Sequence, residues 1–130
     1  TVAEVDPENS ISRISVVTSR TPMNIEQIKA QLERLVPVHN ISDLTIDGPS
    51  VERELALVKV KGQGNKRVEA LRIADIFRAR AIDSTNNSFI FEISGSTNKL
   101  DAFIRLMKPI GLVEISRTGV VAISRGKKGI

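Results

Sequence analysis

The side chains best able to do chemistry are few and far apart. His39 is the only histidine and the chain has no cysteine, so it offers neither a thiolate nor a cluster of imidazoles for a metal. A histidine without a partner is a weak candidate for a ligand or general base. Glu52, Arg53 and Glu54 follow one another at the start of a predicted strand, where neighbouring side chains point in opposite directions. This favours a solvated ion-pair segment over paired catalytic carboxylates, and we predict no catalytic and no metal-binding residue.

Two further motifs suit ligand binding, but each has a simpler interpretation. Residues 62–66 (GQGNK) form a predicted strand-to-helix turn, where backbone amides can meet an anion. The spacing lacks the remaining residues of a dinucleotide or phosphate-binding loop, which favours a plain tight turn. Phe89 and Phe91 resemble the aromatic strand on which RNA-binding sheets stack bases. They share an apolar face with Ile93, however, and this favours burial of both rings in a core.

Composition suits an ordinary folded protein. Hydrophobic residues make up 41% of the 130 residues, enough for one domain or two very small ones. Nineteen basic and fifteen acidic residues leave a net charge of +4, and these charges are dispersed, so a nucleic-acid-binding module is only an alternative. The apolar runs are too short for a membrane span and no secretion signal is visible, so we expect a cytoplasmic protein with no membrane or nucleic-acid partner.

The first part of the chain predicts the order strand, strand, helix, strand. Residues 1–5 and 11–18 are rich in β-branched residues and flank a turn-forming segment, which predicts a hairpin. Residues 24–35 place Ile25, Ile28, Leu32 and Leu35 at helical spacing. Pro37 is expected to stop this helix, and residues 38–46 are predicted to form a strand.

The second part predicts the order strand, helix, strand, strand, helix, strand. The strands are expected at 54–61, 80–84, 88–94 and 113–116, and the helices at about 65–77 and from Ser96, as N-cap, to Pro109. In the first strand, alternation places Ala56, Val58 and Val60 on one face and Leu55, Leu57 and Lys59 on the other. Helical spacing predicts the core faces of the two helices, which are Ala70, Ile73, Ala74, Phe77 and Leu100, Phe103, Ile104, Met107. Residues 120–124 are expected to pair with 113–116 as a hairpin around Gly119.

This second order is the ferredoxin-like split arrangement, and the first part matches only its second half. We therefore predict an α+β protein with two ferredoxin-like (βαββαβ) domains. Residues 1–48 form the first, which lacks its first strand and helix, and residues 49–130 form the second. The missing strand would lie in the middle of the first sheet, so we expect that portion to be absent from this sequence or supplied by another chain.

Several stretches, taken in order, carry a family resemblance. They cover residues 12–15, 25–32, 34–38, 51–55, 57–59, 76–78, 94–96, 99–103 and the ending EISRTGVVAISRG at 114–126. Together they resemble the small regulatory subunit of acetohydroxyacid synthase (acetolactate synthase). The resemblance implies that the first domain is an ACT domain that forms a homodimer and binds a branched-chain amino-acid effector such as valine. It also implies a chain that is not an enzyme.

The same resemblance implies a partner, the large catalytic subunit, which this chain would activate and make sensitive to feedback inhibition. Thiamine diphosphate, FAD and magnesium are expected on that partner and no cofactor on this chain. The effector-binding residues would lie upstream of Thr1, so none is assigned here. As the candidate contact with the catalytic subunit we take the hairpin loop Asp6, Pro7, Glu8, Asn9 and Ser10, together with Arg13. A solvent-exposed connection without function is the other interpretation of this loop.

Overall fold

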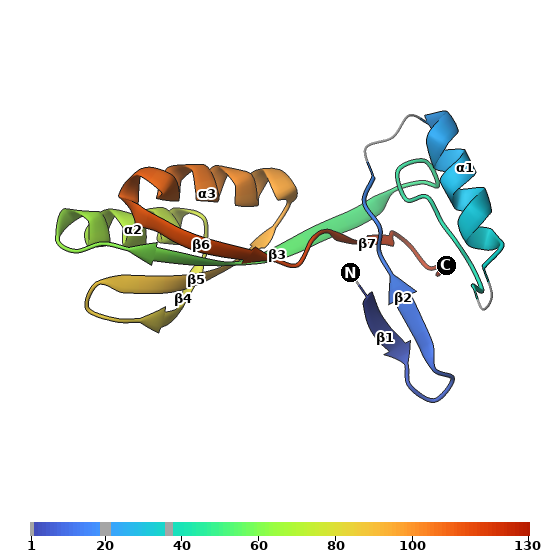
Figure 1. The fold of residues 1–130 in the computed structure, drawn as a ribbon, viewed down its shortest axis with the longest axis horizontal. Helices are drawn as coiled ribbons and strands as arrows, with labels where there is room; N and C mark the ends of the chain where they lie inside the picture. The colour runs from blue at the N-terminus through green and yellow to red at the C-terminus, as the bar shows by residue number, and fades with distance from the viewer. Residues whose placement is uncertain (1, 19–21, 36–37) are drawn as a thin grey trace. The chain divides into compact units, whose positions relative to one another are not determined.

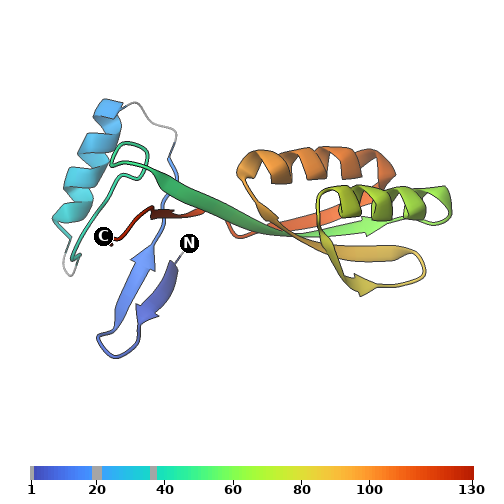
Figure 2. The same ribbon diagram turned by 180° about the vertical axis from the view of Figure 1, so that it is seen from behind.

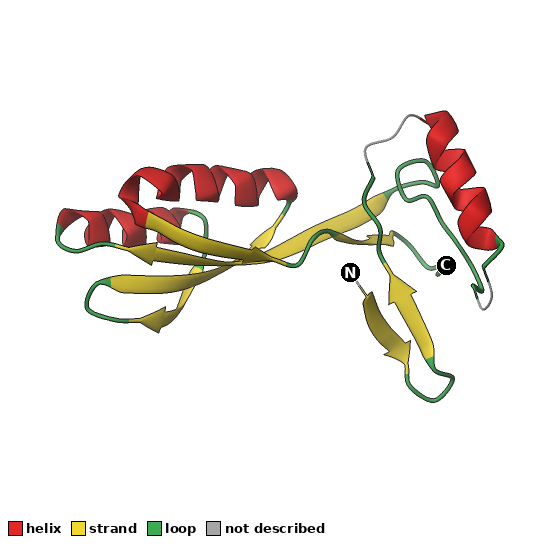
Figure 3. Cartoon of the chain, viewed as in Figure 1, coloured by secondary structure: helices red, strands yellow, loops and turns green. Residues whose placement is uncertain are grey.

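The computed structural model describes residues 2–18, 22–35 and 38–130. Figures 1 and 3 show the order of the elements and their type. In chain order they are β1 (Val2–Asp6), β2 (Ile11–Ile14), α1 (Pro22–Glu33), β3 (Ser50–Lys61), α2 (Asn65–Ile76), β4 (Arg80–Ser84), β5 (Ser88–Gly95), α3 (Thr97–Gly111), β6 (Leu112–Arg117) and β7 (Val121–Ser124). In the described residues, no helix is both long enough and apolar enough to cross a bilayer.

The chain divides into two compact units. Unit 1 comprises residues 1–51 together with 122–130, and unit 2 comprises residues 52–121. This division lies close to the expected boundary after residue 48, but it groups the last nine residues with the N-terminal part. We describe each unit by itself.

Unit 2 is a four-stranded antiparallel sheet with both of its helices on one side. The strand order is β4-β5-β3-β6, so the first strand of the unit lies between the third and the fourth. Figure 2 shows α2 and α3 on the same side of this sheet. Val58 of β3 lies opposite Phe91 on one neighbour and Ile115 on the other, which places these three side chains on one face. The predicted ferredoxin-like order is thus confirmed for this part.

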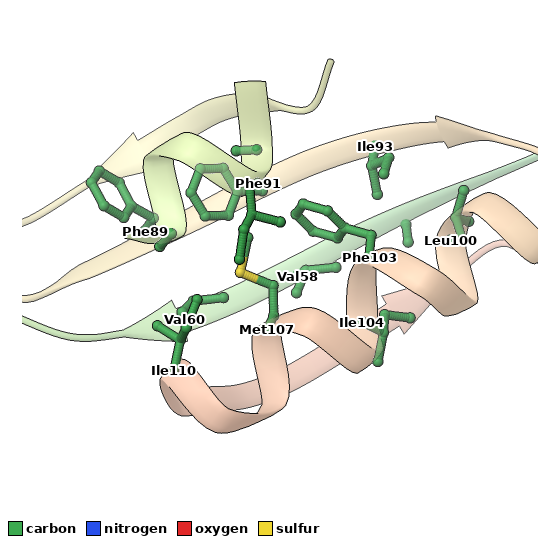
Figure 4. Packing of buried hydrophobic residues seen from close by; sticks show 14 residues of the cluster. Val58, Val60, Phe89, Phe91, Ile93, Leu100, Phe103, Ile104, Met107 and Ile110 are labelled. Atoms are coloured by element: carbon green, nitrogen blue, oxygen red, sulfur yellow. The ribbon is translucent and has the colours of Figure 1, made fainter. Parts of the chain in front are cut away.

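The core of unit 2 is formed where this face meets the two helices (Figure 4). Phe91 and Phe103 are fully buried, and their rings meet edge to face with centroids 6.1 Å apart. The buried apolar residues are Ala56, Val58, Val60, Ala70, Ile73, Ala74, Phe89, Phe91, Ile93, Leu100, Phe103, Ile104, Met107 and Ile110. The predicted core faces of both helices are confirmed, with Phe77 partly buried against the cluster, and of the two faces of β3 the one that carries Ala56, Val58 and Val60 is buried.

Helix α3 begins as predicted but ends later. The Lys99 N–H donates to the Ser96 hydroxyl at 3.2 Å, so Ser96 is the N-cap. The helix was predicted to end at Pro109 but continues to Gly111. Pro109 lies inside the helix, where it removes one backbone hydrogen bond, and the burial of Ile110 in the core offsets this loss and holds the last turn in place. Gly111 then has φ +146°, and a Cβ there would collide with the carbonyl oxygen of Lys61.

The predicted hairpin between residues 113–116 and 120–124 is wrong. Strands β6 and β7 each pair with β3 and not with each other. Strand β3 begins at Ser50, earlier than predicted, and is long enough to have two partners in succession. After β6 the chain stays beside β3: the Thr118 N–H donates to the Leu55 carbonyl at 3.0 Å, and the Leu55 N–H donates to the Thr118 hydroxyl at 3.1 Å.

Unit 1 contains the predicted hairpin and helix. Strands β1 and β2 pair antiparallel with Val2 opposite Ile14, although β2 ends at Ile14 and not at residue 18. Helix α1 matches the predicted helix within two residues at each end, and Ile25, Ile28 and Leu32 are half-buried along it. The predicted stop at Pro37 lies outside the described residues.

The strand predicted at residues 38–46 is wrong, because side chains there bind the local backbone. The Asp43 carboxylate accepts from the N–H and the hydroxyl of Thr45, at 3.0 and 2.6 Å. The Asp47 carboxylate accepts from the Asp43 N–H and the Ser42 hydroxyl, both at 2.9 Å. The hydrogen bonds from Thr45 lower the pKa of Asp43. Asp and Ser side chains that bind nearby amides favour a turn over a strand ladder, and this part of the chain forms a turn.

Candidate functional site

The candidate loop at the end of the β1–β2 hairpin has a fixed shape. The Asp6 carboxylate accepts from the side-chain amide of Asn9 at 2.8 Å and from its backbone N–H at 3.3 Å. The side-chain bond is the larger cause of a lowered pKa at Asp6. The Ser10 N–H donates to the Pro7 carbonyl at 3.4 Å, and Ser10 has φ +54°, in the left-handed region. Pro7, Glu8, Asn9 and Ser10 are exposed, so the loop presents a preorganised polar tip.

Arg13 differs from the rest of the candidate residues. Its guanidinium donates to the carbonyl oxygen of Ala122 at 3.1 Å and is partly buried. Arg13 therefore joins β2 to β7 within unit 1 and does not extend toward the loop tip. The structure divides the six residues into a turn scaffold built on Asp6 and Asn9, an exposed charge at Glu8, and an anchor at Arg13.

The other motifs from the sequence are largely used by the fold. Phe89 and Phe91 are 4% and 0% exposed, which confirms their predicted burial and leaves neither ring free to stack on a base. The Arg67 guanidinium lies 4.1 Å from the centre of the Phe89 ring. At the glycine-rich turn, the Gly62 N–H donates to the Asn87 carbonyl at 2.8 Å, so this amide is not available to an anion.

A shallow depression lies beside that turn. It is lined by Lys61, Gly62, Gln63, Lys66, Asn87, Ser88 and Ile110. Gly64 precedes α2 with φ +60° and gives the helix no side-chain cap. Lys61 and Lys66 make the depression positively charged, which would suit an anion. No other feature of the described residues at this turn points to a bound ligand.

His39 is exposed and the acidic side chains are dispersed. Over residues 2–18, 22–35 and 38–130, no group of three or more His, Asp and Glu residues is gathered to hold a metal ion.

Sequence reasoning missed one charged cluster. The Arg117 guanidinium bridges two carboxylates, with Nη2 bound to Glu54 Oε1 and Nη1 bound to Asp101 Oδ1 at 2.7 Å. These two bonds, with Glu54 contributing most, raise the pKa of Arg117 above its usual value. Glu54 is only 6% exposed and is the one charged residue buried among those described.

The expectation of a solvated ion-pair segment at residues 52–54 is therefore wrong for Glu54. Arg53 is exposed and donates to the carbonyl of Glu52 at 2.7 Å, and it makes no bond to Glu54 in the described structure. The signal that could have found the cluster is strand alternation, because Glu54 shares its face of β3 with Ala56, Val58 and Val60. A carboxylate at the end of such an apolar row needs a cationic partner.

The opposite face of the unit 2 sheet is mixed in character. Leu57 is 37% exposed there, and Leu55 and Ile90 are half-buried beside it. Lys59 and Glu114 form an ion pair across β3 and β6 on this face at 2.9 Å. The face therefore combines a small apolar centre with charged neighbours.

Comparison with known proteins gives one consistent result. A family model described as the small subunit of acetolactate synthase matches residues 53–126. The acetolactate synthase small subunit of Aquifex aeolicus is 43% identical over 119 residues, which cover 91% of this chain and 62% of that protein. The small subunit of Haemophilus influenzae is 39% identical over 131 residues, covering 100% of this chain and 79% of that protein.

A solved structure agrees with the sequence matches. The crystal structure of the acetolactate synthase small subunit from Thermotoga maritima superposes with a TM-score of 0.73 at 37% identity, covering 85% of this chain and 68% of that one. This chain thus spans about two thirds of the length of several relatives that it matches. Because the family model covers more than half of the chain and similarity to named relatives extends over nearly all of it, the chain belongs to the acetolactate synthase small-subunit family.

Proposed function

We propose that this chain is a regulatory, non-catalytic subunit of acetolactate synthase in the cytoplasm. It binds the large catalytic subunit, raises its activity and makes it sensitive to valine or a related branched-chain amino acid. The observation that carries this proposal is the similarity to proteins named small subunits, at about 40% identity over nearly the whole chain. Thiamine diphosphate, FAD and magnesium belong to the catalytic partner in this proposal, and this chain holds none of them.

Residues 1–48 belong, in this proposal, to an ACT domain through which two small subunits pair. The order of hairpin and helix in unit 1 supports this, since it matches part of a βαββαβ domain. Exposed apolar side chains on the hairpin also support it, because Val2 and Ile14 are 67% and 65% exposed and would gain from a covering surface. The effector is bound, on this proposal, by residues upstream of Thr1.

The test is a titration of the intact small subunit into the catalytic subunit, with acetolactate formation measured with and without valine. The expected result is saturable activation and a lower rate when valine is added. A catalytic subunit whose rate does not respond to the small subunit would contradict the proposal. Binding to nucleic acid that weakens steeply with salt would instead support the alternative function.

The proposed contact with the catalytic subunit is the exposed tip of the hairpin loop. Glu8→Ala removes its exposed charge without removing a described side-chain contact, so activation should require about fivefold more small subunit. Effector affinity of the free small subunit should stay unchanged. Glu33→Ala, an exposed carboxylate at the end of α1, is the matched control and should behave as wild type.

Asp6→Ala and Arg13→Ala separate shape from contact. Asp6→Ala removes the acceptor for both Asn9 bonds, and Arg13→Ala removes the bond to Ala122. Asp6→Ala should weaken activation about as much as Glu8→Ala if the shape of the turn matters. Wild-type activation by all three variants would place the contact elsewhere, with the outer sheet face around Leu57 as the next surface to test.

A further inference from the structure

The chain passes between its two units twice. The first passage is between Val51 and Glu52, inside the unbroken strand β3, and the second is between Val121 and Ala122, at the start of β7. Any conformational signal carried by the backbone from one unit to the other must use one of these two passages. What holds the two passages in place is therefore relevant to regulation.

On the unit 2 side, the two passages are fastened to each other. Thr118 and Leu55 exchange hydrogen bonds of 3.0 and 3.1 Å between the segment that follows β6 and strand β3. Immediately beside them, Arg117 is bound to Glu54. Both anchor points lie within a few residues of the passages, so a shift of one backbone segment must either move the other or break these bonds.

Arg117 extends the connection to a helix. Its second nitrogen binds Asp101 in the first part of α3, so one planar guanidinium joins β3, β6 and α3. The geometry of such a fork is demanding, and a small slide of β6 along β3 cannot keep both carboxylates bound. Because Glu54 is buried, a broken pair would leave a carboxylate without a counter-charge in an apolar setting. These properties favour two discrete arrangements over a continuous range.

We propose that the Glu54–Arg117–Asp101 cluster couples the two units, by holding both chain passages to each other and to helix α3. This inference rests on the proposed regulatory function, in which the effector acts through the N-terminal domain. When the backbone at either passage shifts, the intact cluster transmits the shift to β6 and α3. Arg117 is a positioning residue in this scheme, since it acts through the strands and the helix that it joins.

The structural half of the proposal is tested on the chain alone by amide hydrogen exchange. Arg117→Gln should speed exchange at Thr118 and Leu55 by about tenfold, because local opening near the passages becomes easier. Glu114→Gln is the matched control, since it removes an exposed ion pair between the same two strands, away from the passages, and should leave both amides unchanged. Equal exchange in Arg117→Gln and wild type would overturn the proposal.

A second variant guards against loss of folding. Asp101→Asn removes the more exposed arm of the cluster, with Asp101 46% exposed, and leaves Arg117 bound to the buried Glu54. It should fold as wild type and show faster exchange at the start of α3. Unchanged exchange there would show that α3 is not part of the coupling.

The regulatory half is tested in the complex of intact small subunit and catalytic subunit, with valine as the probe. Asp101→Asn and Arg117→Gln should still activate, but should need about threefold to tenfold more valine for half-inhibition, while Glu114→Gln keeps the wild-type value. Such a split between activation and inhibition is not expected of a merely structural defect. Variants that match wild type in both would overturn the coupling role. A wild-type subunit that neither activates nor responds to valine would instead overturn the proposed function itself.

Discussion

The two units contain similar kinds of residues but bury them very differently. In the described residues, all of the fully buried apolar side chains lie in unit 2, between Ala56 and Ile110. In unit 1 the large apolar side chains of the hairpin stay exposed, from 38% for Ile11 to 67% for Val2. Since stabilisation follows the apolar area removed from water, unit 2 carries the stability of the chain. A hairpin and one helix without a shared core are only marginally stable in water.

The two units differ in whether they cover their own apolar surface. Unit 2 has its complete ferredoxin-like set of elements and covers its own apolar face with α2 and α3. Unit 1 presents an apolar surface that a partner would cover. This difference fits the proposed roles, in which the N-terminal part pairs with a second copy and the C-terminal part folds independently.

The largest expected effect comes from separating the units. A polypeptide of residues 52–121 should unfold in one cooperative thermal transition, because it retains the entire core. A polypeptide of residues 1–51 should show no cooperative transition. Circular dichroism against temperature measures both, and a cooperative transition in the shorter polypeptide would remove the contrast between the units.

The next effect is that of single core substitutions. Phe103→Ala should lower the free energy of unfolding by about 3 to 5 kcal/mol, since Phe103 is fully buried against Phe77 and Phe91. Leu32→Ala on the half-buried face of α1 should change it by less than about 1 kcal/mol. Urea unfolding of the whole chain measures the two values, and similar losses would show that unit 1 contributes to the same cooperative core.

Much of unit 2 could be predicted from the sequence because its elements follow simple periodicities. Alternation in β3 and β5 and the spacing of Leu100, Phe103 and Met107 determine which faces are buried. Strand pairing is a tertiary property, so the partner of β7 could not be inferred from local spacing. The stretch 38–46 has β-branched and apolar residues, yet the short side chains of Asp43 and Asp47 decide its structure through local bonds.

The cluster around Arg117 could not be predicted from local spacing either. Glu54, Asp101 and Arg117 are far apart in the sequence, and only the antiparallel pairing of β3 with β6 and the position of α3 bring them together. The candidate loop, by contrast, is local, and its shape follows from the Asp6–Asn9 spacing. Its role as a contact remains a prediction.

The smallest expected effect concerns pH and unit 1. The hydrogen bonds from Thr45 lower the pKa of Asp43 below its ordinary value of 3.8. These bonds therefore stabilise the turn fully when the pH is above 3.8, and this stabilisation is lost as the pH falls through the lower pKa of the folded protein. Amide exchange or chemical shift at Thr45 should therefore change as the pH falls below 3.8. Asp43→Asn keeps an oxygen acceptor that does not titrate and should abolish this change. A pH response that persists in Asp43→Asn would assign it to another group.

The conformation of Gly111 has a consequence for the gene. Its left-handed φ and its approach to the Lys61 carbonyl leave no room for a Cβ at the point where α3 turns directly into β6. All glycine codons share their first two bases, and any change in either base encodes a residue with a Cβ or a stop signal. Silent third-base changes are thus the only point mutations that this codon can accumulate without displacing the backbone of β3.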